Sequence, residues 1–130
     1  MVDLNNLFQS ADWKKEKHTP VIEVIGKAKK AEPIDIKVTV GKEIAHPNTT
    51  EHHIRWIDVY FLPEGEKFPF EIGKSEFTSH GASINGANSS TIYSDPITSL
   101  TFKTEKSGTI IAFSSCNIHG LWQNTLELKF

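Results

Sequence analysis

Histidine and cysteine are the residues of this chain best suited to chemistry, and they occur in unequal numbers. The 130 residues include six histidines but a single cysteine, Cys116, and the only methionine is Met1. One thiol forms no intrachain disulfide and supplies no four-cysteine metal site. A metal site in this chain would therefore rely mainly on imidazole nitrogen, with at most one thiolate.

The side chains that could bind a metal gather in three short clusters. The first is Glu16 to Pro20, which includes His18; the second is His46 to His53; the third is Cys116 to Gly120. Each cluster interrupts a pattern typical of a strand. We therefore expect each to lie on a loop that a sheet holds in place.

The spacing of Cys116 and His119 decides what local structure they need. Residues three apart on a strand point to opposite faces, whereas in a tight turn both can reach one ion. Asn117 and Gly120 favour such a turn. Backbone N–H groups in the turn can also point at the sulfur and stabilise a thiolate.

The second cluster offers two imidazoles across a loop. Residues 47–50 form the loop that lets His46 approach a later histidine. That partner is either His52 or His53, because neighbouring residues on a strand face opposite ways and only one can point inward.

Each of these features also has an ordinary structural explanation. An isolated Cys-x-x-His is a weak motif, and loop histidines such as His80 are commonly solvated or hydrogen-bonded. The charge run around Glu16 and Lys17 is typical of a solvated face, and Trp56 and Trp122 suit a core. Only the occurrence of all three clusters in one chain favours a metal site.

The remaining sequence predicts an all-β protein. A short helical segment is expected at residues 3–8, behind a possible Asp3 cap. Beyond Pro20 the apolar residues recur with period two, which is typical of half-buried antiparallel strands. About seven or eight short strands are usual for a sandwich. We expect strands at 21–25, 34–40, 53–62, 68–72, 98–103, 108–114 and 125–130, with a weaker one at 75–80.

Composition narrows the class of protein. The length fits one domain over residues 1–130. A net charge of −2 gives no broad basic face for nucleic acid. No apolar run reaches the length of a membrane span, and the first residues do not resemble a signal peptide. We therefore expect a cytoplasmic protein that binds neither nucleic acid nor membrane.

The three clusters resemble, in the same order, the motifs of superoxide reductase. The matching segments are Glu16-Lys17-His18-x-Pro20, then His46 to Ile54, then Cys116-Asn-Ile-His-Gly-Leu-Trp122. More narrowly, the chain resembles the short single-iron form called neelaredoxin. The longer, desulfoferrodoxin-like members add a four-cysteine iron domain, whose cysteines are missing here. The resemblance implies an immunoglobulin-like β-sandwich that reduces superoxide to hydrogen peroxide at a mononuclear non-haem iron.

The same resemblance assigns roles to individual residues. It implies that Cys116 is the axial thiolate of the iron and that Glu16 occupies the sixth position in the oxidised resting state. It places Lys17 beside the open coordination position, and it selects His52 over His53. The four equatorial nitrogen ligands that it implies are His18, His46, His52 and His119. The family also implies a rubredoxin-like electron donor and a homotetramer.

Two other classes of protein stay open at this stage. A blue-copper electron carrier is also a β-sandwich with a late cysteine and histidine, but it usually needs two histidines and an axial methionine. A metal-free interaction module would leave the three clusters unexplained. Metal content separates the classes, because it would be one iron, one copper or none per chain.

Overall fold

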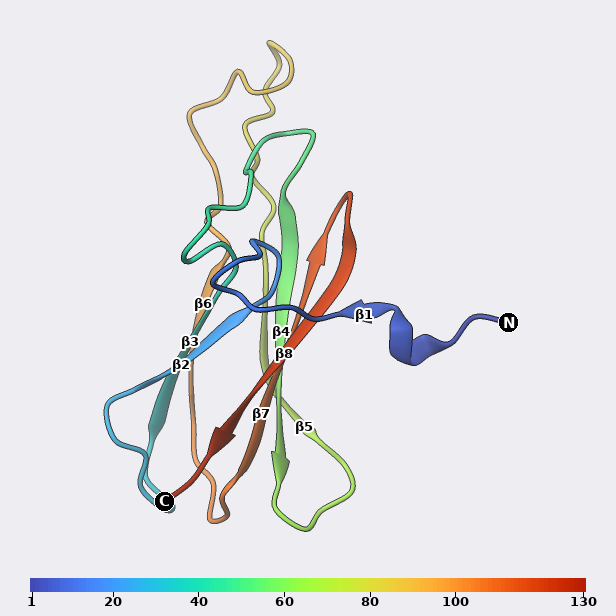
Figure 1. Ribbon diagram of the computed structural model, residues 1–130. Helices are drawn as coiled ribbons and strands as arrows, with labels where there is room; N and C mark the ends of the chain where they lie inside the picture. The colour runs from blue at the N-terminus through green and yellow to red at the C-terminus, as the bar shows by residue number, and fades with distance from the viewer.

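Two β-sheets packed against each other form the body of the protein (Figure 1). The computed structural model describes residues 1–130. The larger sheet has the strand order β1-β8-β7-β4-β5, and the smaller has the order β2-β3-β6. The strands are β1 (Phe8–Gln9), β2 (Val21–Ile25), β3 (Ile34–Thr39), β4 (Ile54–Pro63), β5 (Phe70–Glu76), β6 (Ile97–Phe102), β7 (Gly108–Cys116) and β8 (Gly120–Leu128). The expected β-sandwich is confirmed.

Alternating residues of both sheets form one apolar core. In β3, Ile34 and Ile36 are buried while Asp35 between them is exposed. In β7, Ile110 and Ala112 are fully buried. All pairings in the two sheets are antiparallel except that of the short β1 with β8. This is the pattern expected when each strand buries one face and leaves the other near solvent.

The N-terminal prediction is only partly right. A single 3₁₀ turn, η1 (Leu4–Asn6), forms behind Asp3, whose carboxylate accepts the backbone N–H of Asn5 at 3.0 Å. Leu4 is exposed and buries no helical face. Phe8 leaves the turn and joins β1, where its ring packs on Phe113 with 4.9 Å between centroids. A two-residue strand has no period that a sequence pattern can reveal.

The last strand begins earlier than expected. β8 starts at Gly120, not near residue 125, and of the three alternating apolar residues at its end only Leu128 is buried. Its first half shows no apolar alternation because polar side chains there have specific partners. Gln123 donates to the carbonyl of Phe8 at 3.2 Å, and Asn124 donates to that of Pro20 at 2.8 Å.

The expected strand over residues 75–80 is mostly wrong, because only residues 75 and 76 are in a strand, as the end of β5. Beyond Glu76, the N–H of Phe77 donates to the carbonyl of Arg55 in β4 at 2.8 Å, and His80 forms an isolated bridge with Tyr93, which lies between β5 and β6. β5 also starts at Phe70 rather than at residue 68. Phe70 forms the last pair with β4, opposite Phe61, and Phe68 lies in the bend before it.

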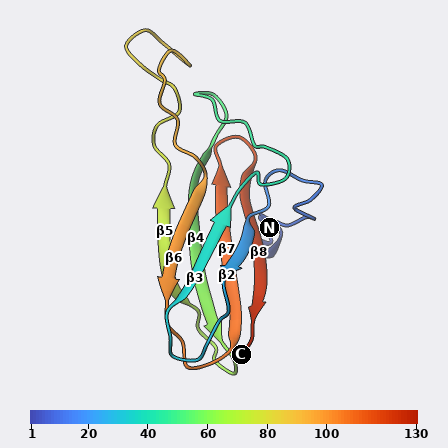
Figure 2. The same cartoon turned by 90° about the vertical axis from the view of Figure 1, so that its left-hand side faces the viewer.

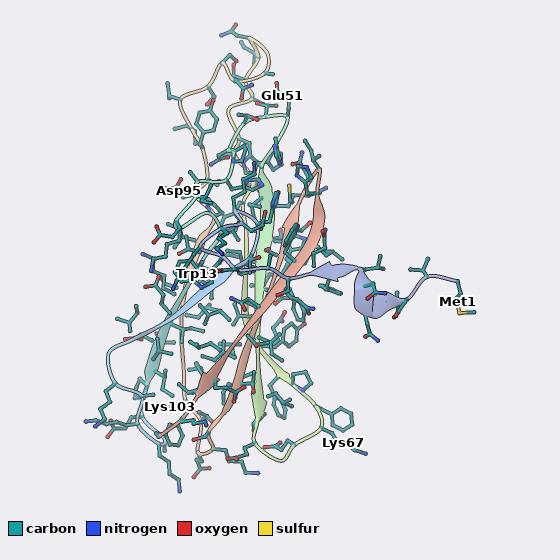
Figure 3. The ribbon with its side chains drawn as sticks, in the orientation of Figure 1. Met1, Trp13, Glu51, Lys67, Asp95 and Lys103 are labelled. Atoms are coloured by element: carbon teal, nitrogen blue, oxygen red, sulfur yellow. The ribbon has the colours of Figure 1, made fainter.

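The loops that carry the second and third clusters extend to one end of the sandwich, and the segment before β2 brings His18 to them. In Figure 2 the β7–β8 hairpin, the loop before β4 and the long segment between β5 and β6 extend to the same end. Figure 3 places Glu51 toward this end, and Lys67 and Lys103 toward the opposite end. The only helical element has three residues, and no helix is long and apolar enough to cross a membrane.

Candidate metal centre

Four donor side chains from three parts of the chain converge at this end of the sandwich. The donor atoms of His18, His52, Cys116 and His119 all lie within 4.8 Å of one another. His18 precedes β2, His52 precedes β4, and the other two belong to the β7–β8 hairpin. The sheet thus brings together residues that are 101 positions apart in the sequence.

The hairpin geometry places Cys116 and His119 on the same side. Cys116 ends β7 opposite Gly120, so the chain reverses within three residues. Gly120 has a φ of 80°, a left-handed conformation that glycine adopts without strain. The backbone N–H of His119 donates to the Cys116 sulfur at 3.4 Å, and the His119 Nδ1 lies 3.8 Å from that sulfur.

Asn117 fixes the hairpin to the loop that carries His52. Its side-chain amide donates to the carbonyl of Glu51 at 2.9 Å, and its side-chain oxygen accepts the backbone N–H of His53 at 2.8 Å. Its own N–H donates to the carbonyl of His53 at 3.1 Å. The sequence indicated only a turn residue here. No local pattern could show that its partners lie on a loop 64–66 residues away.

Glu16 orients the ring of His18. One carboxylate oxygen lies 2.5 Å from His18 Nδ1, and the other accepts the backbone N–H groups of His18 at 2.6 Å and Thr19 at 3.1 Å. Burial alone would raise the pKa of Glu16, but these hydrogen bonds and the charge of His18 bring it below its usual value. An ionised Glu16 holds the proton of His18 on Nδ1, which leaves Nε2 free to bind a metal.

His46 completes a ring of four imidazoles. Its centroid lies 4.7 Å from that of His18 and 4.7 Å from that of His52. Its Nδ1 donates to the carbonyl of Pro47 at 2.6 Å, so its Nε2 carries the lone pair. Gly41 makes room for this segment, because a Cβ there would stand 2.5 Å from the backbone nitrogen of His46.

The structure separates His52 from its neighbour. His52 belongs to the donor cluster, whereas the ring of His53 stacks on His80 with 3.6 Å between centroids and 7° between planes. His53 Nδ1 donates to the carbonyl of Thr49 at 2.9 Å. Both residues lie in the loop before β4, which begins at Ile54, so hydrogen bonds to Thr49 rather than strand alternation orient them.

Two of the four imidazoles are held neutral, mainly by burial. Burial, together with the charges of His18, His52 and Lys17 and against the hydrogen bond to Pro47, lowers the pKa of His46 to about 4. Burial, His119 and His18 likewise lower the pKa of His52. Near neutral pH both rings therefore hold a lone pair rather than a second proton, as a metal ligand must.

The donor set fits a transition-metal ion. The Nε2 atoms of His46 and His52 are buried with no hydrogen-bond partner, which is costly unless a ligand engages them. His18 Nε2 lies 3.1 Å from His119 Nδ1. Two nitrogens at right angles around an ion at about 2.1 Å lie about 3 Å apart. Imidazole with one thiolate suits iron, copper or zinc and does not suit magnesium or calcium.

Glu16 and Lys17 lie beside the donors rather than among them. The carboxylate of Glu16 is engaged with His18 and Thr19. Lys17 is half-buried, and its charge is close enough to contribute to the lowered pKa of His46 and of His52.

Two residues that the sequence left as ordinary have specific contacts near the centre. His80 is buried, with Nε2 donating to the carbonyl of Phe77 at 2.7 Å and Nδ1 lying 2.8 Å from the Asn48 side-chain oxygen. It thereby connects the second cluster to the segment after β5. Trp122 is also buried and stacks on His18.

Fold and site together define a β-sandwich metalloprotein whose centre combines histidine nitrogen with one cysteine sulfur. Comparison with known proteins gives the same class. The sequence model of the desulfoferrodoxin family matches residues 10–125. The superoxide reductase of Pyrococcus furiosus is 53% identical over 97% of this chain and 99% of its own length. The neelaredoxin of Megalodesulfovibrio gigas is 48% identical over 92% of each chain.

Solved structures agree with these relatives. The superoxide reductase (neelaredoxin) from Archaeoglobus fulgidus in the reduced form is 58% identical and superposes with a TM-score of 0.90, covering 95% of this chain and 99% of that one. A superoxide reductase structure in the oxidised state gives a TM-score of 0.89 at 53% identity, covering 98% and 100%. This chain belongs to the desulfoferrodoxin family, and within it to the neelaredoxin-like superoxide reductases.

Proposed function

We propose that this protein is a superoxide reductase with one iron ion per chain. Superoxide takes up one electron and two protons to give hydrogen peroxide, and an external donor then returns the electron. The proposal rests on the convergence of four imidazoles and one cysteine sulfur. The Nε2 atoms of His46 and His52 are buried there without a hydrogen-bond partner. A copper carrier would need fewer imidazoles.

We assign the iron ligands from the donor cluster and the resemblance together. His18, His46, His52 and His119 would hold the iron through ring nitrogens, and Cys116 would hold it through its sulfur. When bound, the iron supplies the electron that reduces superoxide. Cys116 would donate electron density to the bound metal, and the N–H of His119 donates to its sulfur at 3.4 Å. Asn117 and Glu16 hold the ligands in place.

Lys17 and Glu16 have separate roles in this proposal. Superoxide is an anion and the protein carries a net charge of −2, so attraction must be local. Lys17 supplies a positive charge beside the imidazoles. We propose that the Glu16 carboxylate would bind the iron in the oxidised resting state. To reach it, the carboxylate must leave His18 Nδ1 and two backbone N–H groups, so this role requires the loop to rearrange.

The family resemblance also suggests an electron donor, an oligomeric state and a cellular compartment. We propose a rubredoxin-like protein as electron donor and a homotetramer as the assembly. The N-terminal segment projects from the body of the protein in Figure 1. It exposes apolar side chains that support association between copies, namely Val2 (66% exposed), Leu4 (71%) and Leu7 (46%). We propose that residues 1–130 act as one domain, because one continuous core joins the sheets. A reducing cytoplasm suits a lone thiolate ligand.

Metal analysis of the purified protein and of Cys116→Ser tests the proposal. We expect about one iron per chain in the native protein, a visible sulfur-to-iron absorption band in its oxidised form, and superoxide consumption without release of dioxygen. The serine variant should lose the band and most of the iron, because a hydroxyl is a poor substitute for a thiolate. One copper per chain, or turnover and colour that survive the substitution, would contradict it.

A further inference from the structure

Trp122 lies flat against one of the cluster imidazoles. The centroids of its ring and that of His18 are 4.8 Å apart, and the two planes differ by 13°. The indole is 8% exposed, so the pair is largely shielded from water. Near-parallel aromatic rings at this separation form an offset stack, a preferred arrangement.

The same indole also contacts His119, the histidine of the β7–β8 hairpin. Its Nε1–H donates to the carbonyl of His119 at 3.3 Å, and the side-chain amide of Gln9 donates to that carbonyl at 3.0 Å. Trp122 stands beside Gln9 in the pairing of β8 with β1. One side chain thus touches the ring of His18 and the backbone of His119. The Nε2 of His18 and the Nδ1 of His119 lie 3.1 Å apart.

These contacts restrict a motion that the other contacts of His18 leave free. Glu16 fixes the direction of Nδ1, but a hydrogen bond at one ring atom still permits the ring plane to tilt. The neighbouring rings of His46 and His119 stand edge-on to His18, at 76° and 72°. A flat surface against the ring face is what holds its plane, and Trp122 supplies that surface.

We propose that Trp122 is a positioning residue of the metal centre, which fixes the plane of the His18 ring and the place of the His119 backbone. The inference deepens the proposed function, since it concerns ligands assigned there. Outer residues that orient metal ligands typically change metal affinity 10–100-fold when replaced.

A pair of variants tests this role. Trp122→Phe keeps an aromatic face against His18 but loses the N–H, whereas Trp122→Leu keeps an apolar side chain but loses the flat face. With Co²⁺ as the probe in metal-free protein, we expect Trp122→Leu to weaken binding about 10-fold and to alter the cobalt visible spectrum. Trp122→Phe should recover most of the affinity and the native spectrum. Gln9→Ala, which removes only the neighbouring hydrogen bond to His119, should have a smaller effect on both.

A purely structural role predicts a different result. If Trp122 only fills the core, Trp122→Leu would lower the thermal midpoint yet leave the cobalt spectrum and affinity unchanged, and that outcome would overturn the inference. Equal losses in Trp122→Leu and Trp122→Phe would also overturn it, because the ring face would then not matter. Cobalt binding does not depend on iron being the natural metal, so failure of the proposed function would show separately, in the metal content of the native protein.

Discussion

Asn117 and His53 exchange hydrogen bonds in both directions. The backbone N–H of His53 donates to the Asn117 side-chain oxygen at 2.8 Å, and the backbone N–H of Asn117 donates to the carbonyl of His53 at 3.1 Å. Each residue directly follows an assigned iron ligand, Cys116 or His52. The pair therefore sets the distance between the hairpin and the loop before β4.

Replacement of Asn117 by alanine should loosen the metal centre. The substitution removes two side-chain hydrogen bonds, to Glu51 and His53. We expect iron to transfer to a chelator about 10-fold faster, and the free energy of unfolding to fall by about 1–2 kcal/mol. Asn85→Ala, in an exposed loop, is the matched control. Equal iron release from the native protein and Asn117→Ala would show that the link does not position the ligands.

Replacement of Glu16 by alanine should separate metal retention from substrate reduction. The change removes the partner of His18 Nδ1, so we expect iron release about 10-fold faster than in the native protein. In iron-loaded protein the second-order rate constant with superoxide should stay close to native, while the absorption of the oxidised form should change. Pulse radiolysis measures the rate, with Glu32→Ala as an exposed control. A collapse of the rate constant would assign Glu16 a role in substrate capture.

Lys17 should accelerate the encounter with superoxide without holding the iron. Its half-buried ammonium lies near His46 and His52, where local positive charge attracts an anion. We expect Lys17→Ala to slow the second-order step ~10-fold at low ionic strength. The difference should shrink in 1 M salt, where the Debye length is ~3 Å. Lys67 lies at the opposite end of the molecule in Figure 3, so Lys67→Ala should leave the second-order rate unchanged at low and at high salt. Loss of iron from Lys17→Ala would indicate a structural role instead.

Asp58 should make stability depend on pH independently of the metal centre. Burial, together with the hydrogen bond and charge of Glu71, raises the pKa of Asp58 to about 6, against the smaller effects of Lys74 and Tyr60. The folded state then binds this proton more tightly than the unfolded chain, so the free energy of unfolding should fall as pH rises from about 4 to about 6.

Chemical denaturation across that pH range tests the effect. Asp58→Asn should remove much of the pH dependence and raise stability at pH 7, because a neutral amide avoids the cost of burying an ionised carboxylate beside Glu71. Asp95→Asn, at an exposed carboxylate, is the control. An unchanged slope in Asp58→Asn would show that another group carries the dependence.

The amino-acid sequence was enough to predict most sheet-forming segments and the candidate donors. Alternating residues such as Ile34, Ile36 and Val38 bury one face of a strand, so their order along the chain shows which side faces the core. The choice between His52 and His53 needed the resemblance, because alternation shows only that one of two neighbours faces inward.

The residues that hold those donors in place are visible only in the folded protein. The stack of Trp122 on His18, the bond of Gln9 to His119 and the link from Asn117 to His53 join positions 64–110 residues apart. Local spacing carries no information about such partners. The pairing of β1 with β8 and the polar first half of β8 were not predicted for the same reason. The side chains of Gln123 and Asn124 donate to carbonyl groups of distant segments, so they show no alternating apolar pattern.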